Sequence, residues 1–261
     1  MSTGFLRQSF LTYKGLNTYL NWPAFVANVL VRPIVLVAMI GFTARYARAS
    51  EGLEQFLIGM IVLTGAQILS TQVLLCFYNE RTLGTLPFLF ASRGSRLKSY
   101  LARGIVHLPT VGLVMAIALF SEMLMFGVRF EQANWLAVVG MLSAISLSMM
   151  GFCMFLGNFC ILIRNSWFLM VLLINSLMFL LTGAVLPLSA LPGAISWVGT
   201  FLPITHGVEA LKGAFAGKDI ALIQQNGITE VAIGAFYLVA GYVFFRYVEY
   251  RARKLGTYEN N

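Results

Sequence analysis

The chain has 261 residues and a net charge of +8; 59% of its residues are hydrophobic, 11% are charged, and the mean hydropathy is +0.80. Soluble domains carry roughly 25% charged residues, so this composition excludes a water-soluble fold and predicts an all-α integral membrane protein. The basic excess is typical of topology signals and of contacts with membrane lipid, and we expect no nucleic-acid partner. The three cysteines and two histidines lack metal-ligand spacing, so we expect no metal site.

The N-terminal segment, residues 1–22, is amphipathic and lacks the apolar core and cleavage site of a signal peptide, which predicts a helix lying on the inner membrane surface. Six later segments reach the length of about 20 apolar residues that a span requires. A further apolar stretch, 186–217, is interrupted by prolines and glycines. It predicts short re-entrant helices at the outer face, with an ordinary outer loop and interfacial helix as the alternative. The predicted spans are about Ala24–Thr43, Phe56–Phe77, Ile105–Phe126, Trp135–Ile163, Trp167–Val185 and Val231–Val248.

Basic residues are distributed unevenly between the two sides of the predicted membrane. If the N-terminus lies inside, most of the 18 lysines and arginines fall on the inner side and most acidic residues fall outside. The positive-inside rule then places both termini in the cytoplasm, and we expect a multi-pass protein of a bacterial inner membrane. No connection is long enough for a soluble domain, so residues 1–261 form one membrane domain and any energy-coupling domain is expected in a separate chain.

The connection between the second and third predicted spans, residues 79–103, is both basic and amphipathic. Glu80 and Thr82 can begin a short helix, and Pro87 limits its continuity. A loop that bound only anionic lipid would not need an apolar face beside an acidic start. We therefore interpret residues 79–97 as a docking surface for another protein, with lipid binding as the alternative.

Polar residues inside the predicted spans form a candidate translocation pathway. The alternative for each of them is a hydrogen bond between helices, worth roughly 0.6 to 2 kcal/mol. Two charged residues, Arg32 and Glu122, are expected to extend to opposite membrane surfaces, with a gating pair as the alternative. The candidate pathway residues are Asn28, Gln67, Ser70, Thr71, Asn175 and Thr182.

Two motifs resemble those of ABC-2 type transporter permeases. The first, Glu80-Arg81-Thr82-Leu83-Gly84-Thr85-Leu86 followed by Ala91-Ser92 and a basic run, is similar to the first cytoplasmic loop of that family. The second combines Leu186–Pro192 with Leu202–Lys212 and is similar to the family's outer loop, amphipathic helix and Leu-Pro-(apolar)-Thr-His segment. The order of six spans matches over the whole chain.

The resemblance implies the membrane subunit of an ABC exporter for an amphiphile such as a drug-like natural product, a peptide, a glycolipid or a lipid. It implies two six-span subunits, identical or closely related, each sitting on an ATP-binding subunit that holds ATP and magnesium, so that this chain has no cofactor and is not itself an enzyme. The implied coupling contacts are Glu80, Arg81, Thr82, Gly84, Thr85, Leu86, Phe88 and Leu89. The implied outer gate contains Pro187, Pro192, Trp197, Pro203 and His206.

Other functions are less consistent with the sequence. A secondary transporter or channel would predict an internal repeat and buried acidic residues for ion coupling, but no repeat is evident and the first aspartate is Asp219. An intramembrane enzyme would need a partner for His107, and none is evident. The run Gly213–Asp219 only faintly resembles a phosphate loop, because its glycine spacing is one residue short and no strand precedes it.

Overall fold

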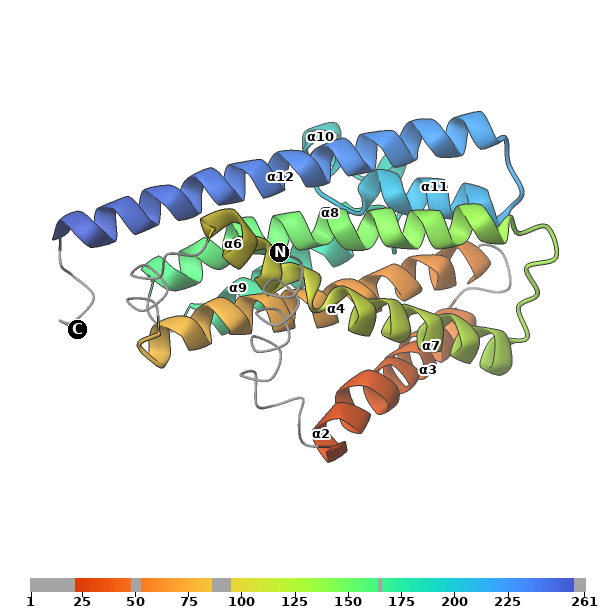
Figure 1. Ribbon diagram of the computed structural model, residues 1–261. Coiled ribbons are helices and arrows are strands. Elements are labelled where there is room, and N and C mark those ends of the chain that lie inside the picture. The colour runs from red at the N-terminus through yellow and green to blue at the C-terminus, as the bar shows by residue number, and fades with distance from the viewer. Residues whose placement is uncertain (1–21, 48–52, 86–94, 164–165, 256–261) are drawn as a thin grey trace.

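The computed structural model describes residues 22–47, 53–85, 95–163 and 166–255, and every element in these ranges is a helix. The long helices form an elongated bundle (Figure 1). Most of the predicted N-terminal surface helix, residues 1–21, lies outside the described residues. The elements are α2 (Trp22–Val26), η2 (Ala27–Val31), α3 (Arg32–Ala47), α4 (Leu53–Thr82), α6 (Arg96–Ile105), α7 (Leu108–Phe126), α8 (Trp135–Leu162), α9 (Trp167–Leu181), η3 (Leu188–Ala190), α10 (Gly193–Thr200), α11 (Thr205–Phe215) and α12 (Ile220–Leu255).

Within the described part of the chain, five helical segments are long and apolar enough to cross a membrane. They correspond to the predicted spans one to four and six. The predicted fifth span corresponds to α9, whose 15 residues cover only about 22 Å, against a hydrocarbon thickness of about 30 Å. The length of α9 alone therefore does not make it a span. The five segments are Ala27–Tyr46, Leu53–Thr82, Arg96–Phe126, Trp135–Leu162 and Ile220–Arg251.

The first candidate span contains a π-helical turn just before its proline. Pro33 has no backbone N–H, so it cannot donate to the carbonyl of Val29 as a helical residue would. The five residues of η2 take up this defect with a wider turn, and α3 continues directly from Arg32. The helix therefore passes through the Arg32-Pro33 interruption that the sequence indicates.

Helix α4 is the centre of the bundle and packs against α3, α7, α8, α9 and α11. Its buried residues are distributed all round the helix, as expected for a helix that is apolar on every side. We name the two ends of the bundle after this helix. The Thr82 end also holds the start of α6 and the ends of α8 and α12, whereas the Leu53 end holds the end of α7 and the starts of α8 and α12 (Figure 1).

Helices α8 and α12 lie side by side along the bundle and run in the same direction (Figure 1). Gly227, Gly234 and Gly241 recur at seven-residue spacing on α12 and face α8. A Cβ atom added to Gly234 would lie 2.4 Å from the Cα of Ser148, so only glycine permits this approach. The seven-residue period keeps one face of a helix toward its neighbour. The α8–α12 pair is therefore a closely packed unit.

Helix α9 and the residues that follow it run antiparallel to α4. Trp167 lies 5.9 Å from Tyr78 between ring centroids near the Thr82 end. At the opposite end, the backbone of Ala184 packs directly on Gly59, where an added Cβ atom would clash with it. From Tyr78 to Gly59, α4 rises about 28 Å. The segment from Trp167 to Ala184 therefore follows α4 over most of the thickness of a bilayer.

Residues 186–217 fold into η3, α10 and α11 at the Leu53 end, where the sequence predicts short helices. One face of α11 is buried and packs against α8 and α12. The residue before this helix, Ile204, has a φ of 81°, in a region that β-branched residues rarely adopt. The backbone from Leu202 to Thr205 is buried in protein, as irregular backbone near a bilayer requires, whereas most residues of η3 and α10 are exposed.

Candidate coupling site and outer cavity

The predicted coupling loop begins with a well-formed helix cap. Gly84 has a φ of 65°, which glycine adopts without steric cost. Its N–H donates to the Arg81 carbonyl at 3.1 Å, and the N–H of Thr85 donates to the Glu80 carbonyl at 3.0 Å. These two bonds form the Schellman motif that ends many helices. The Gly-Thr pair therefore fixes where α4 stops and where the loop leaves the bundle.

Glu80 forms a largely buried ion pair with the helix that follows the loop. The Nε of Arg103 donates to Glu80 Oε1 at 2.7 Å, and the side chains are 1% and 21% exposed, respectively. The guanidinium also lies over the rings of Phe77 and Phe245, at 5.2 and 4.9 Å from their centroids, a cation–π geometry. One residue thus joins α4, α6 and α12 at the base of the loop.

Arg81 and a second ion-pair group extend this connection. Arg81 Nη1 donates to the Ile161 carbonyl at 2.9 Å and so satisfies an acceptor in the last turn of α8. Glu249 on α12 accepts from Arg96 Nε at 2.9 Å and from Arg246 Nη1 at 3.2 Å. At the Thr82 end, side-chain contacts therefore connect α4, α6, α8 and α12 around the base of the loop.

These contacts give the described part of the predicted coupling set a structural role within the chain. Glu80, Arg81, Gly84 and Thr85 all make bonds within the chain, and Thr82 bonds the Tyr78 carbonyl. Their contact with a partner subunit stays a prediction. The remaining three predicted contacts, Leu86, Phe88 and Leu89, lie outside the described residues.

The candidate pathway residues do not form one continuous group. Ser70 Oγ donates to Asn175 Oδ1 at 3.1 Å and joins α4 to α9, which favours the alternative of a bond between helices. Thr71 bonds the carbonyl of Gln67 on its own helix. Asn28 lies in η2, next to a small buried group of Val29, Ile68 and Val114. Thr182 is buried and borders a cavity at the Leu53 end.

The expectation that Glu122 extends to the membrane surface was wrong. Its side chain is fully buried, and neither carboxyl oxygen has a hydrogen-bond partner among the described residues. The reason is its position on α7, where it continues the buried stripe of Val111, Met115 and Ala118 that packs into the bundle. Arg32 is half-buried at the start of α3.

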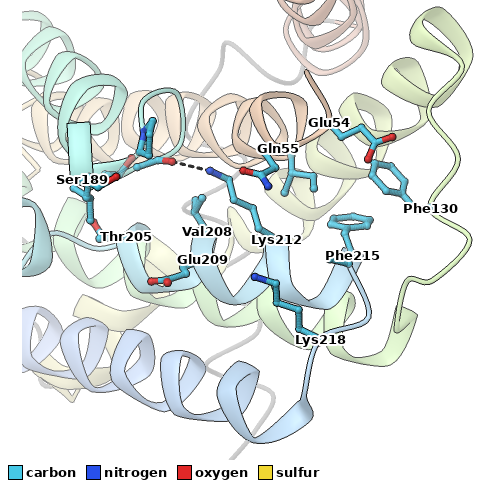
Figure 2. Close-up of a pocket in the computed structure, with 16 residues that line it drawn as sticks. Glu54, Gln55, Phe130, Ser189, Thr205, Val208, Glu209, Lys212, Phe215 and Lys218 are labelled. Carbon is cyan, nitrogen blue, oxygen red and sulfur yellow. Dashed lines mark hydrogen bonds between the residues drawn. The ribbon is translucent and has the colours of Figure 1, made fainter. Parts of the chain in front are cut away.

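A cavity of about 470 Å³ lies at the Leu53 end, between the start of α4, the end of α9, η3 and α11 (Figure 2). Four charged residues line it: Glu54, Glu209, Lys212 and Lys218. Lys212 Nζ donates to the Gly183 carbonyl at 2.8 Å. Burial lowers the pKa of Lys212, and the negative charge of Glu209 opposes that shift. A second anionic partner in the cavity would therefore stabilise the lysine's charged form.

The predicted outer gate residues lie on or beside η3, α10 and α11, and one of the five lines this cavity. Pro187 lines the cavity, and Pro192 precedes the first turn of α10. Trp197 is 65% exposed on α10 and contacts Phe201 edge to face at 4.9 Å between ring centroids. Pro203 is buried, and His206 Nε2 lies 3.2 Å from the Thr200 carbonyl. Their role in gating stays a prediction.

Glu230, which belongs to none of the predicted sites, holds the start of α11. This α12 residue is fully buried. Its Oε1 accepts from the N–H of Ile204 at 2.7 Å, and its Oε2 accepts from the N–H of Gly207 at 2.9 Å. The carboxylate thus satisfies two backbone donors at a helix N-terminus, where negative charge is favoured. It links the last span to the wall of the cavity.

The fold is that of a multi-pass membrane protein, because long apolar helices surround a largely buried central helix and expose large apolar side chains around the bundle. The family model of the ABC-2 type transporter matches residues 6–216, and the chain belongs to this family. It is therefore a transmembrane subunit of an ABC-type transporter, as the two sequence motifs indicated. No curated protein shows a significant match to the chain.

Proposed function

We propose that the chain is the permease subunit of an ATP-driven exporter that moves an amphiphilic substrate out of the cytoplasm or the inner leaflet. A separate ATP-binding subunit, which binds ATP and magnesium, docks on the loop after α4. A second six-span permease, identical or closely related, completes the transporter in a bacterial inner membrane. The observation that carries this proposal is the capped and ion-paired base of the loop, within a chain of the ABC-2 family.

The proposed topology has six crossings, with both termini in the cytoplasm. The antiparallel course of residues 167–184 along α4 supports α9 as the fifth crossing. Basic side chains concentrate at the Thr82 end, which supports a cytoplasmic location for this end. Its described basic residues include Arg81, Arg96, Lys98, Arg246 and Arg251. The cavity at the Leu53 end then opens on the outer side.

Coupling follows from how the loop is attached. A partner that pulls on the loop acts at Gly84, directly after α4. Because Glu80 and Arg81 bond to α6 and α8, and Glu249 bonds Arg96 on α6, the pull reaches four helices rather than one. The buried interior of the bundle resists continuous deformation, so such a pull favours a switch between discrete arrangements of the spans.

Gly84→Pro is expected to abolish coupling. Proline cannot adopt the positive φ of Gly84 and removes the N–H that bonds Arg81. In vesicles containing the permease and its ATP-binding subunit, ATP-driven transport should fall at least about tenfold, while membrane insertion is unchanged. Gly84→Asn is the matched control, because asparagine tolerates this backbone conformation and should retain transport within about twofold. Normal transport by Gly84→Pro would exclude the loop as the coupling element.

Glu122 favours one alternative, an ion-coupled transporter that needs no ATPase, because buried carboxylates in membranes often carry protons. The proposed ATP-driven mechanism does not use this group. Glu122→Gln should therefore leave ATP-driven transport within about twofold of the unmodified protein. Transport that is driven by a proton gradient without nucleotide, and that Glu122→Gln abolishes, would instead establish the alternative.

A further inference from the structure

We propose that the cavity at the Leu53 end binds a zwitterionic amphiphile, a molecule with a cationic and an anionic group beside an apolar portion. Its assignment as the exported cargo rests on the proposed function, whereas its binding does not. The ion pairs are distributed unevenly between the two ends of the bundle. Among the described residues, the three ion pairs all lie at the Thr82 end. The four charged side chains around the cavity form no ion pair with any residue of the described ranges.

The lack of pairing is most evident on α11. Glu209 and Lys212 are three residues apart, with the acidic residue first, a spacing at which the two side chains can meet on a helix. They do not form an ion pair. Figure 2 shows the Lys212 amine turned toward the Gly183 carbonyl and the Glu209 carboxylate pointing away from it. Each charge is therefore available to a ligand group of the opposite sign.

The other two charges come from different elements. Glu54 lies in the first turn of α4, beside Phe130, and Lys218 follows α11 (Figure 2). The cavity thus presents two carboxylates and two ammonium groups. A ligand with a single charge would leave the groups of its own sign uncompensated beside it. A ligand with both charges can pair with both kinds of group, so the charge pattern favours a zwitterion.

The walls between the charges are apolar. Ile58, Phe130, Val208 and Phe215 line the cavity together with the charged residues. On α11, Val208 and Phe215 share the cavity face with Glu209 and Lys212, because residues three, four and seven apart lie on one side of a helix. Ligand sites combine such apolar walls with a few oriented polar groups. An amphiphile satisfies both parts of this surface.

The size and place of the cavity limit the ligand. At about 470 Å³, it falls within the range of roughly 300–1,000 Å³ of small-molecule sites. It can hold a headgroup and the first part of a chain, but not a whole diacyl lipid. It lies at one end of the bundle, where the polar part of an amphiphile meets water and its chain meets lipid.

Binding to the purified full-length chain in nanodiscs, without nucleotide or ATP-binding subunit, tests the inference. The probes are a lysophosphatidylethanolamine, an apolar tripeptide with free termini, a lysophosphatidylglycerol and an alkylammonium. At least one of the first two should bind about tenfold more tightly than both singly charged probes. Preference for the lysolipid identifies a phospholipid headgroup as the source of the zwitterion, and preference for the tripeptide identifies a peptide. Equal binding of all four probes would overturn the inference.

Variants locate the binding in the cavity. Glu209→Gln and Lys218→Gln are both at exposed positions, so they should fold normally, and each should weaken the preferred zwitterion about tenfold. Glu131→Gln, an exposed position at the same end that does not line the cavity, is the matched control and should not change affinity. Unchanged affinity in both cavity variants would place the ligand elsewhere and refute the site. If the unmodified protein transported with ATP but bound no zwitterion, this inference alone would be refuted. If the cavity variants lost zwitterion binding but kept full ATP-driven transport, only the assignment of the zwitterion as cargo would be refuted. Binding without any ATP-driven transport would refute the export function alone.

Discussion

Glu80→Ala is expected to destabilise the protein by about 3 kcal/mol, because it leaves the Arg103 guanidinium buried without its carboxylate. The guanidinium is almost completely enclosed, and Nη1 and Nη2 have no hydrogen-bond partner among the described residues. The aromatic rings of Phe77 and Phe245 compensate only part of its desolvation. Unfolding of the purified protein in mixed micelles, followed by circular dichroism, measures the loss.

A double-mutant cycle separates the interaction energy of the Glu80–Arg103 pair from other effects of each substitution on the site. Arg103→Met places an unbranched apolar side chain among the same rings and removes the buried cation. The double variant Glu80→Ala/Arg103→Met should be more stable than Glu80→Ala alone, with a coupling energy of about 1–3 kcal/mol. Thr82→Ala, two residues along α4, removes an exposed hydroxyl bond to the Tyr78 carbonyl and should have an effect below about 0.5 kcal/mol. Strict additivity of the two single changes would show that Glu80 and Arg103 do not stabilise each other.

Glu230→Ala is expected to loosen the start of α11. The change removes the acceptor for two buried N–H groups, and each unsatisfied buried donor costs about 1–3 kcal/mol. Ile204 is held at a positive φ beside this carboxylate, so the same change releases backbone strain of about 1–2 kcal/mol. Hydrogen–deuterium exchange of residues 193–215 should therefore accelerate by at least about tenfold, with little change in the α8–α12 pair.

Glu230→Gln is the informative companion to this change. Its amide oxygen can accept one of the two bonds, so its exchange rate should lie between those of the unmodified protein and Glu230→Ala. Glu209→Gln, an exposed change on the same short helix, should leave exchange unaltered. If Glu230→Ala left residues 193–215 as protected as before, the carboxylate would not be what holds α11 in place.

The membrane class and the approximate spans were predictable because hydropathy is a local property of the sequence. Five predicted spans correspond to long apolar helices. Helix boundaries were less predictable. The last span begins at Ile220 rather than near Val231, because its first turns, which include the polar residues Gln224, Gln225 and Asn226, are stabilised by packing against α11, which no local pattern reveals. Glu122 was misplaced for a related reason: its position along the sequence indicates its depth in the membrane but not that it lies on the buried stripe of α7.

In the candidate sites, too, the sequence indicates local motifs, whereas the contacts between distant residues depend on packing. Gly84 and Thr85 belong to a sequence motif, but their role as a helix cap depends on the backbone bonds to Arg81 and Glu80. The partners of Glu80 and Arg81 lie in α6 and α8. Glu230 carries no signal of its own in the sequence, because the groups it bonds lie more than 20 residues away and meet it only when α11 folds back against α12.

By itself, the sequence determined that this protein is a helical membrane protein and that its two motifs are those of the ABC-2 family, since composition and short motifs are local and survive without knowledge of contacts. Only the tertiary structure decided which charges pair. It joins Arg103 to Glu80 across the loop base and, among the residues that the structure describes, leaves four charged side chains without an ion pair around the cavity at the Leu53 end. The physical reason is that pairing depends on distances of a few ångströms between helices, which packing of the whole bundle sets.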